Sequence, residues 1–215
     1  MGIFTQRQSV YAPPIDGPKP NPTLVGGEPE ERPTPNPDEW RIELRRYPIL
    51  HRGHAVLVLV DPANNDIEEL NGWAESRHTG ERTPIGIDGA KLVVPKGTRF
   101  RDKAAWIATL ASGSAAEMNS RWARGWRAAD EIEAKDYDYK AHDPSFEIAG
   151  NGGQIQNSNS VAYTLSRAMG LDADSALRNA RMEQTFPGWG RDLLDPEYRR
   201  NRYFAPPQVP ITDAP

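Results

Sequence analysis

His54-Ala-Val-Leu-Val-Leu-Val60 is apolar at every position after its histidine. A run of this kind is typical of a strand that is buried on both faces, so we expect it to lie in the centre of a sheet. The turn-forming residues Asp61-Pro-Ala-Asn-Asn-Asp66 follow it, and residues 67–73 then provide a partner strand. The sequence therefore predicts an antiparallel hairpin with His54 at the beginning of its buried strand.

Two further stretches, one on either side of this hairpin, are predicted strands. From Trp40 to Arg45, apolar residues alternate with charged ones, which predicts a strand with one face in water. Lys91-Leu-Val-Val-Pro95 is short and apolar, and Pro95 either ends it or places it at a sheet edge. We therefore expect a small, mostly antiparallel sheet.

Helical patterns follow these strands. The alanine and isoleucine positions in residues 102–112 predict a first helix, and an apolar stripe with two tryptophans predicts a longer one at 115–134. A third predicted helix begins near Ser158 and ends at Met169, before Gly170, because glycine is common just after a helix C-terminus. Strands followed by helices indicate an α+β fold.

The two ends of the chain differ in composition from its middle. Residues 1–38 hold nine of the 20 prolines, and a second proline-rich strip lies at 205–210. Such segments bury too little apolar surface to offset the entropy lost on ordering. We therefore expect a disordered or extended arm at 1–38, a single α+β domain at 39–195 and an extended tail at 196–215.

Composition and motifs argue against several classes of function. The 215 residues include 26 basic and 30 acidic side chains, which leaves no basic footprint for nucleic acid. No run approaches the roughly 20 apolar residues that span a bilayer, and the first residues do not form a classical signal peptide, so location is left open between the cytoplasm and non-classical export. Cysteine, paired metal-ligand histidines and phosphate-binding glycine motifs are absent from the sequence, so we expect no metal and no cofactor.

The polar residues Asn157-Ser158-Asn159-Ser160 open the last predicted helix. At about 100° per residue, Ser158 shares the apolar stripe that continues at Ala162, whereas Ser160 points to the opposite side. We therefore expect Ser158 to face the core or a cleft and Ser160 to face water. Asn157 is the expected N-cap.

A serine in the first turn of a helix has two interpretations. Unpaired backbone N–H groups and the positive end of the helix dipole lie there, and both stabilise negative charge on the serine or on a carbonyl oxygen that it attacks. Alternatively, the polar cluster only caps the helix, because Asn and Ser are preferred N-cap residues.

A nucleophilic serine needs a base, and His54 is the preferred candidate among the four histidines because it begins the buried strand. With a symmetric hairpin register, Asn71 lies on the next strand near Val56, and Glu69 precedes it by two residues. Either side chain is a candidate to orient the imidazole. Asn71 is preferred because it is nearer to His54.

A tight turn is predicted at Pro187-Gly-Trp-Gly190. This turn presents Trp189, which either covers the helix or lines a cleft. If Trp189 lines a cleft, it joins Asn157 and Asn159 as a candidate substrate-binding residue.

This order of parts resembles the circularly permuted papain-like enzymes, which include NlpC-type peptidases and lecithin retinol acyltransferase-like proteins. In that group a histidine opens a central strand, a polar residue lies on the next strand, and an Asn-Cys pair begins a late apolar helix. Asn157-Ser-Asn-Ser-Val161 has this layout with Ser158 at the cysteine position, and His54 and Asn71 or Glu69 match the other two parts. The resemblance covers residues 40–170 and implies a papain-like permuted architecture.

The resemblance also implies a function. It implies a hydrolase or acyltransferase that acts on an amide or ester bond of a peptide, peptidoglycan or lipid substrate, with Ser158 as nucleophile and His54 as base. Such domains are common in bacterial envelope enzymes and secreted effectors. Because serine is a poorer nucleophile than a cysteine thiolate, the alternative is a non-catalytic binding or assembly module that docks a partner through its proline-rich arm. A structural protein of a larger particle is a third hypothesis.

Overall fold

A computed structural model describes residues 36–49, 52–83, 89–95, 104–141, 155–182 and 186–195. All of these residues belong to one compact unit, Glu31–Pro215. The predicted tail at 196–215 and all but the last three residues of the predicted arm lie outside the described ranges, as do His51 and His142.

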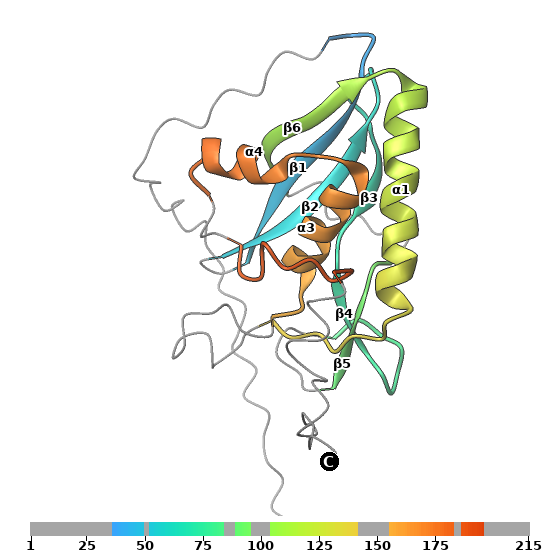
Figure 1. Cartoon of the computed structure of the whole chain (residues 1–215), viewed down its shortest axis with the longest axis vertical. Helices are drawn as coiled ribbons and strands as arrows, with labels where there is room; N and C mark the ends of the chain where they lie inside the picture. Colours follow the sequence, from blue (N-terminus) through green and yellow to red (C-terminus); the bar gives the residue numbers. More distant parts are fainter. Residues whose placement is uncertain are drawn as a thin grey trace, which may run out of the picture. The chain divides into compact units, whose positions relative to one another are not determined.

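The described elements are two antiparallel sheets and a set of helices that follow them (Figure 1). The larger sheet has the strand order β3-β2-β1-β6 and consists of β1 (Trp40–Ile49), β2 (Arg52–Val60), β3 (Asp66–Leu70) and β6 (Ala105–Gly113). The smaller sheet pairs β4 (Trp73–Ser76) with β5 (Ala90–Val93). The helices are α1 (Ala115–Glu133), α3 (Ser158–Met169) and α4 (Ala173–Asn179). The α+β class is confirmed.

The buried strand predicted at His54–Val60 is β2, which lies between β1 and β3 and is buried along its length after Arg52. Its register with β3 places Leu57 opposite Leu70 and Val58 opposite Glu69, as the hairpin pattern predicts. The predicted partner strand is nevertheless shorter, because the chain leaves the sheet after Leu70 and starts β4 at Trp73.

Gly72 lies between β3 and β4, against the beginning of α3. A Cβ atom at this position would lie 3.0 Å from the Cα atom of Ser158 and 2.7 Å from a methyl group of Val161. Only glycine lets the chain pass this close to the helix backbone. The interruption of the strand at Gly72 therefore allows the beginning of α3 to approach the sheet.

The helix predicted at 102–112 is wrong, because residues 105–113 form β6. This segment pairs with β1 from Trp40 to Arg46, with register shifts at two places along the pair. Alanine is compatible with both structures, so backbone pairing with the open edge of β1 outweighs the local helical preference. The longer helix and the last helix are confirmed as α1 and α3.

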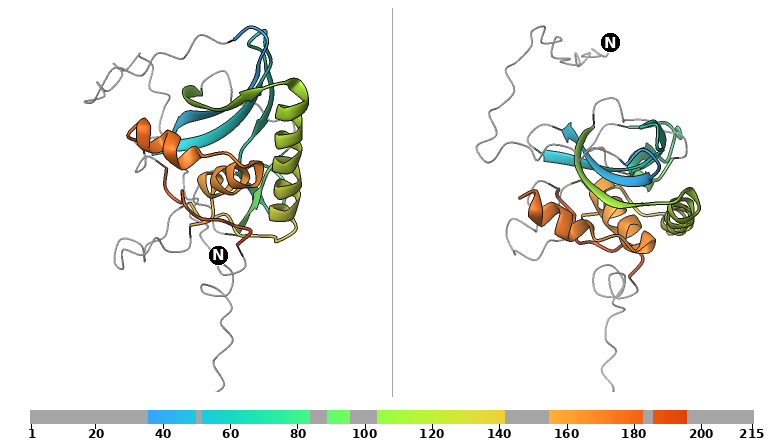
Figure 2. Two further views of the ribbon diagram at one scale, coloured as in Figure 1. Left: turned by 45° about the horizontal axis from the view of Figure 1, so that its top comes forward. Right: turned by 90° about the horizontal axis from the view of Figure 1, so that it is seen from above.

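The main core lies where α1 and α3 pack against one face of the larger sheet (Figure 2). The strands contribute Ile42, Leu44, Leu57, Leu59 and Leu70, and the helices contribute Met118, Trp122, Ile132, Val161, Leu165 and Met169. None of the helices in the described part of the chain is long and apolar enough to cross a membrane.

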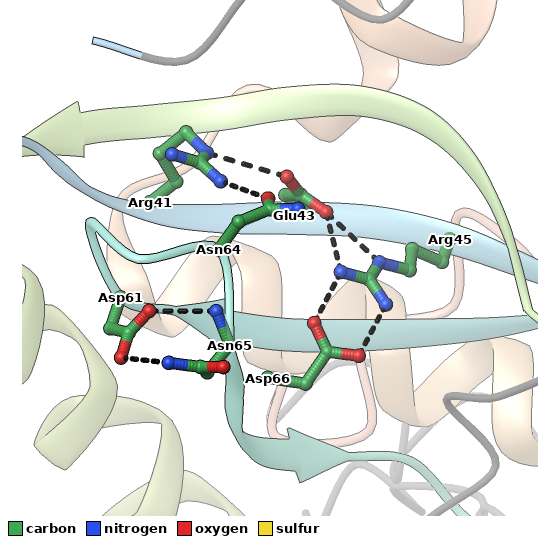
Figure 3. Close-up of polar contacts among 7 residues, drawn as sticks. All are labelled: Arg41, Glu43, Arg45, Asp61, Asn64, Asn65 and Asp66. Atoms are coloured by element: carbon green, nitrogen blue, oxygen red, sulfur yellow. Dashed lines mark hydrogen bonds and ion pairs between the residues drawn. The ribbon is translucent and has the colours of Figure 1, made fainter. Parts of the chain in front are cut away.

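The other face of β1 carries charged side chains that are buried, so the predicted water-exposed face is wrong (Figure 3). The exposed fractions of Arg41, Glu43 and Arg45 are 5%, 0% and 7%. Glu43 accepts hydrogen bonds from both arginines, and Arg45 also binds Asp66 through two hydrogen bonds of 2.6 and 2.7 Å. Mutual pairing replaces most of the hydrogen bonds that water would supply, and Nη1 of Arg41 has no hydrogen-bond partner among the described residues.

Candidate functional site

The first turn of α3 is capped by Asn157, as predicted. Its side-chain oxygen accepts hydrogen bonds from the backbone N–H groups of Asn159 and Ser160, at 2.9 and 3.2 Å. Ser158 is the first helical residue and is only 4% exposed. Asn157 therefore caps the helix. The burial of Ser158 is not explained by capping and must come from other contacts.

Ser160 does not face water, contrary to the prediction from helical phase. It is fully buried, and its hydroxyl donates to the carbonyl of Gly188 at 3.0 Å. The segment 186–195 lies over this side of α3, which a helical wheel of the helix alone does not reveal. Gly188 has a φ of 82°, and a Cβ there would lie 2.8 Å from the Ser160 hydroxyl, so the turn requires glycine.

Asn159 joins the first turn of α3 to the strand that carries His54. Its side-chain oxygen accepts from the backbone N–H of Ala55 at 2.9 Å, and its side-chain nitrogen donates to the carbonyl of Gly53 at 3.1 Å. These two residues flank His54 in the sequence. Ser158 and His54 therefore lie on adjoining backbone segments, although 104 positions separate Ala55 from Asn159.

His54 is oriented by Asn71, as predicted, through a contact of 3.1 Å between the ring Nε2 and the side-chain oxygen. The Asn71 nitrogen donates to Glu69 at 2.6 Å, and the indole N–H of Trp73 donates to the Asn71 oxygen. Because indole is only a donor and carboxylate only an acceptor, these partners fix which way the amide points. The Asn71 oxygen must then accept the proton of Nε2, which leaves Nδ1 of the neutral His54 with its lone pair.

Burial keeps the imidazole of His54 neutral. The side chain is 5% exposed, and burial lowers its pKa to about 4, against the opposing effect of the Asn71 hydrogen bond. The positive charge of Arg82 lowers the pKa further. At neutral pH, His54 is therefore an uncharged base rather than a cation.

This shift predicts a pH dependence of stability. The pKa of His54 is about 4 in the folded chain and 6.5 in an unperturbed histidine, so the unfolded state binds more protons between these pH values. Stability therefore falls as the pH drops from 6.5 towards 4, by about 3 kcal/mol from this residue. The measurement is urea unfolding of the wild type and His54→Gln across this range.

The difference between the two profiles of unfolding free energy against pH gives the contribution of His54 separately from that of the carboxylates, which also titrate. His78→Gln is the matched control, because His78 is exposed in the turn after β4, and it should leave the profile unchanged. Parallel profiles for the wild type and His54→Gln would contradict the prediction.

Tyr139 contacts Ser158 and was not found from the sequence. Burial raises the pKa of Tyr139, while its contacts with the side chain and backbone of Ser158 oppose that change. Its backbone N–H donates to the carbonyl of Ala90 in β5 at 2.7 Å. The next residue, Lys140, pairs with Gln156, just before α3. The alternation in Asp136-Tyr-Asp-Tyr-Lys140 was the only available signal.

Most of the backbone N–H groups in the first turn of α3 already have acceptors, so few donors are left to stabilise an oxyanion near Ser158. The N–H groups of Asn159 and Ser160 are occupied by the Asn157 side chain, and that of Val161 is occupied by the Asn157 carbonyl at 3.0 Å. The hydroxyl of Tyr139 contacts the side chain of Ser158 and also accepts from the backbone N–H of Ser158. The raised pKa of Tyr139 keeps its hydroxyl protonated.

The candidate substrate-binding residues make contacts within the chain. Asn157 and Asn159 are 4% and 3% exposed, and each also donates to the carbonyl of Pro187 at 3.0 Å. Trp189 donates to Asp174 at 2.7 Å and packs edge-on against Tyr163. These contacts give all three a positioning or covering role, and substrate binding by them stays a prediction.

Among the described residues, no group of three or more His, Cys, Asp or Glu side chains is placed to hold a metal ion. Comparison with protein-family models, curated proteins and solved structures gives no match for this chain. The function is therefore inferred from the side-chain geometry around Ser158 and His54.

Proposed function

We propose that this protein hydrolyses an amide or ester bond, or transfers its acyl group, with Ser158 as nucleophile and His54 as general base. The observation that carries the proposal is the pair of Asn159 hydrogen bonds to the backbone of Gly53 and Ala55, which joins the first turn of the serine helix to the strand segment that carries His54, whose Nε2 contacts Asn71. This leaves Nδ1 as the basic atom.

In the proposed mechanism, the Ser158 oxygen attacks the carbonyl carbon of the substrate while its proton passes to Nδ1 of His54. The Asn71 oxygen holds the opposite ring nitrogen of the imidazolium, and Glu69 in turn fixes the Asn71 amide. The hydroxyl of Tyr139, which contacts Ser158, stabilises the carbonyl oxygen as it becomes negative. His54 then protonates the leaving group, and a water or acceptor alcohol or amine releases the acyl group by the reverse sequence.

The substrate class rests on the resemblance to permuted papain-like enzymes, which points to peptide, peptidoglycan or lipid. The non-catalytic binding module remains the alternative, and it predicts that Ser158 can be replaced without loss of function. A direct test of the nucleophile separates the two.

The test is labelling with a fluorophosphonate, in which the serine oxygen displaces fluoride from phosphorus. We expect the wild type to be labelled, Ser158→Ala not to be labelled, and His54→Gln to be labelled at least about 100-fold more slowly, because general base catalysis contributes roughly 100- to 10,000-fold. Labelling is measured by intact mass and by the position of the modified peptide.

Ser166→Ala is the matched control for this test. Ser166 is another buried serine of α3, and its hydroxyl donates to the carbonyl of Ala162 at 2.8 Å. Its loss should leave labelling intact. Equal labelling of Ser158→Ala and wild type would contradict the proposal, and a folded wild type that is neither labelled nor able to cleave 4-nitrophenyl esters would favour the binding module.

A further inference from the structure

Gln156 lies directly before the cap of α3, and the carbonyl oxygen of its side chain is buried without a donor. The residue is 3% exposed, and Oε1 has no hydrogen-bond partner among the described residues. Its backbone is fixed by two hydrogen bonds with Lys140, at 2.7 and 3.1 Å. Buried polar atoms are nearly always hydrogen-bonded, so an acceptor without a donor two residues before the candidate nucleophile needs an explanation.

The chain is extended at the cap, and this sets the direction of the Gln156 side chain. Asn157 has a φ of −143° and a ψ of −172°, and the two residues that flank an extended residue project to the same side of the chain. Gln156 and Ser158 therefore share one side, with their Cα atoms about 7 Å apart.

The opposite side of this segment is filled by the turn at Gly188. A Cβ atom at Gly188 would lie 2.6 Å from a methyl carbon of Ile155 and 3.0 Å from the side-chain oxygen of Asn157. Ile155 and Asn157 therefore face the turn, and the alternation of extended backbone directs Gln156 away from it. The side chain of Gln156 thus lies on the side of the nucleophile, where a substrate would bind.

The group that completes Gln156 must be an N–H or O–H donor, because an amide oxygen only accepts. Ser158 is 4% exposed, so the two side chains are enclosed to a similar extent on one side of the chain. A carbonyl carbon bound at Ser158 brings its neighbouring atoms close to a residue two positions away. A peptide has an amide N–H beside its scissile carbonyl, and the acyl chain of a lipid has none.

We propose that Oε1 of Gln156 accepts a hydrogen bond from the substrate N–H on the acyl side of the scissile carbonyl. This inference rests on the proposed function, because it selects a peptide from the substrate classes of the same site. The acyl side stays bonded to Ser158 until the acyl group is released, so one fixed acceptor serves both steps. A lipid substrate would leave this buried acceptor unpaired, which makes Gln156 a specificity-determining residue.

The first experiment compares N-acetylalanine 4-nitrophenyl ester with the 4-nitrophenyl ester of O-acetyllactic acid, in which an oxygen replaces the N–H. We expect the wild type to have the higher kcat/KM for the alanine ester. Gln156→Met should lower the ratio of the two values by about 3- to 10-fold, which is the range for a neutral hydrogen bond. Gln156→Glu keeps an acceptor oxygen and should keep the preference. A ratio that Gln156→Met does not change would overturn the proposal.

Urea unfolding separates this role from a structural one. Methionine is close to glutamine in size and needs no hydrogen bond, so Gln156→Met should keep or raise the urea midpoint. Thr164→Val is the matched control, because it removes an equally buried group that accepts from the backbone N–H of Leu193 at 2.9 Å, and it should lower the midpoint. A lower midpoint for Gln156→Met with an unchanged ratio would assign Gln156 to the fold alone.

The second experiment does not depend on turnover and uses Ser158→Ala. The side-chain amide signal of Gln156, assigned by its loss in Gln156→Met, is followed by NMR while N-acetylalanine methylamide or O-acetyllactic acid methylamide is added. We expect the alanine compound to shift this signal more than the lactic acid compound does. If fluorophosphonate labelling fails but this difference is present, the proposed reaction is wrong and the N–H acceptor stands. If the two compounds shift the signal equally or not at all, the N–H acceptor is wrong, whatever the labelling shows.

Discussion

Replacing Glu43 with alanine is expected to lower the free energy of unfolding by about 3–5 kcal/mol, because it leaves two buried arginines without their shared carboxylate. Glu43 is completely buried and lies between Arg41 and Arg45, with contacts of 3.4 Å to the first and 2.8 Å to the second. Arg45 retains Asp66, whereas Arg41 retains the neutral oxygen of Asn64 at 2.8 Å and a charge interaction with Asp61. Urea unfolding followed by circular dichroism measures the loss.

Two variants separate charge from burial in this prediction. Glu43→Gln keeps the size and one acceptor oxygen, so it should cost less than alanine but more than a surface change. Glu117→Ala removes an ion pair with Arg121 in which the glutamate side chain is 51% exposed, and it should cost no more than about 1 kcal/mol. If Glu43→Ala cost as little as Glu117→Ala, the buried ion pairs would not stabilise the fold.

The buried charges also bear on the site, because they share a face of the sheet with His54. The register of β1 and β2 places Arg45 opposite Val56 and Tyr47 opposite His54. Directly opposed residues of an antiparallel pair project to the same side of the sheet. The ion pairs of β1 therefore lie on the same face of the sheet as the side chain of His54, and α3 packs against the opposite face.

The hairpin and its polar pair could be predicted from the sequence because strand periodicity is local. An apolar run with a turn after it specifies both the strand and its register, which places Asn71 beside His54. The start of α3 was equally readable, since an Asn before a polar-apolar helical pattern is a strong capping signal. These features depend on residues that are close in the chain.

The errors concern contacts between distant segments. Residues 105–113 form a strand because β1 offers them an open edge, and Ser160 is buried because residues 186–195 cover it. The charged face of β1 is buried because its charges pair with one another. Arg82 and Tyr139 reach the site by way of loops whose course no periodicity encodes.

Replacing Asn159 with alanine is expected to damage both the fold and the proposed active site. The substitution removes hydrogen bonds to Ala55, Gly53 and Pro187, and it leaves the backbone N–H of the fully buried Ala55 without its acceptor. An unsatisfied buried group costs about 1–3 kcal/mol, so we expect a loss of about 2–4 kcal/mol in the free energy of unfolding. Urea unfolding measures this first effect.

The second effect of Asn159→Ala is a loss of serine reactivity in molecules that remain folded. Without the hydrogen bonds to Gly53 and Ala55, the first turn of α3 can shift relative to His54. A misplacement of about 1 Å lowers reactivity by roughly 100-fold. The rate of fluorophosphonate labelling, measured well below the unfolding midpoint, reports this effect separately from stability. Asn159→Asp tests the geometry, because it keeps an acceptor for Ala55 but directs negative charge at two carbonyls.

Asn65→Ala is the matched control for the amide itself. Its side chain donates to Asp61 at 2.9 Å in the exposed turn after β2, so both stability and labelling should stay close to wild type. If Asn159→Ala lost stability but labelled at the wild-type rate, the Asn159 bridge would serve the fold alone. If both properties fell together with Asn65→Ala unaffected, a single buried amide would couple the candidate nucleophile to its base.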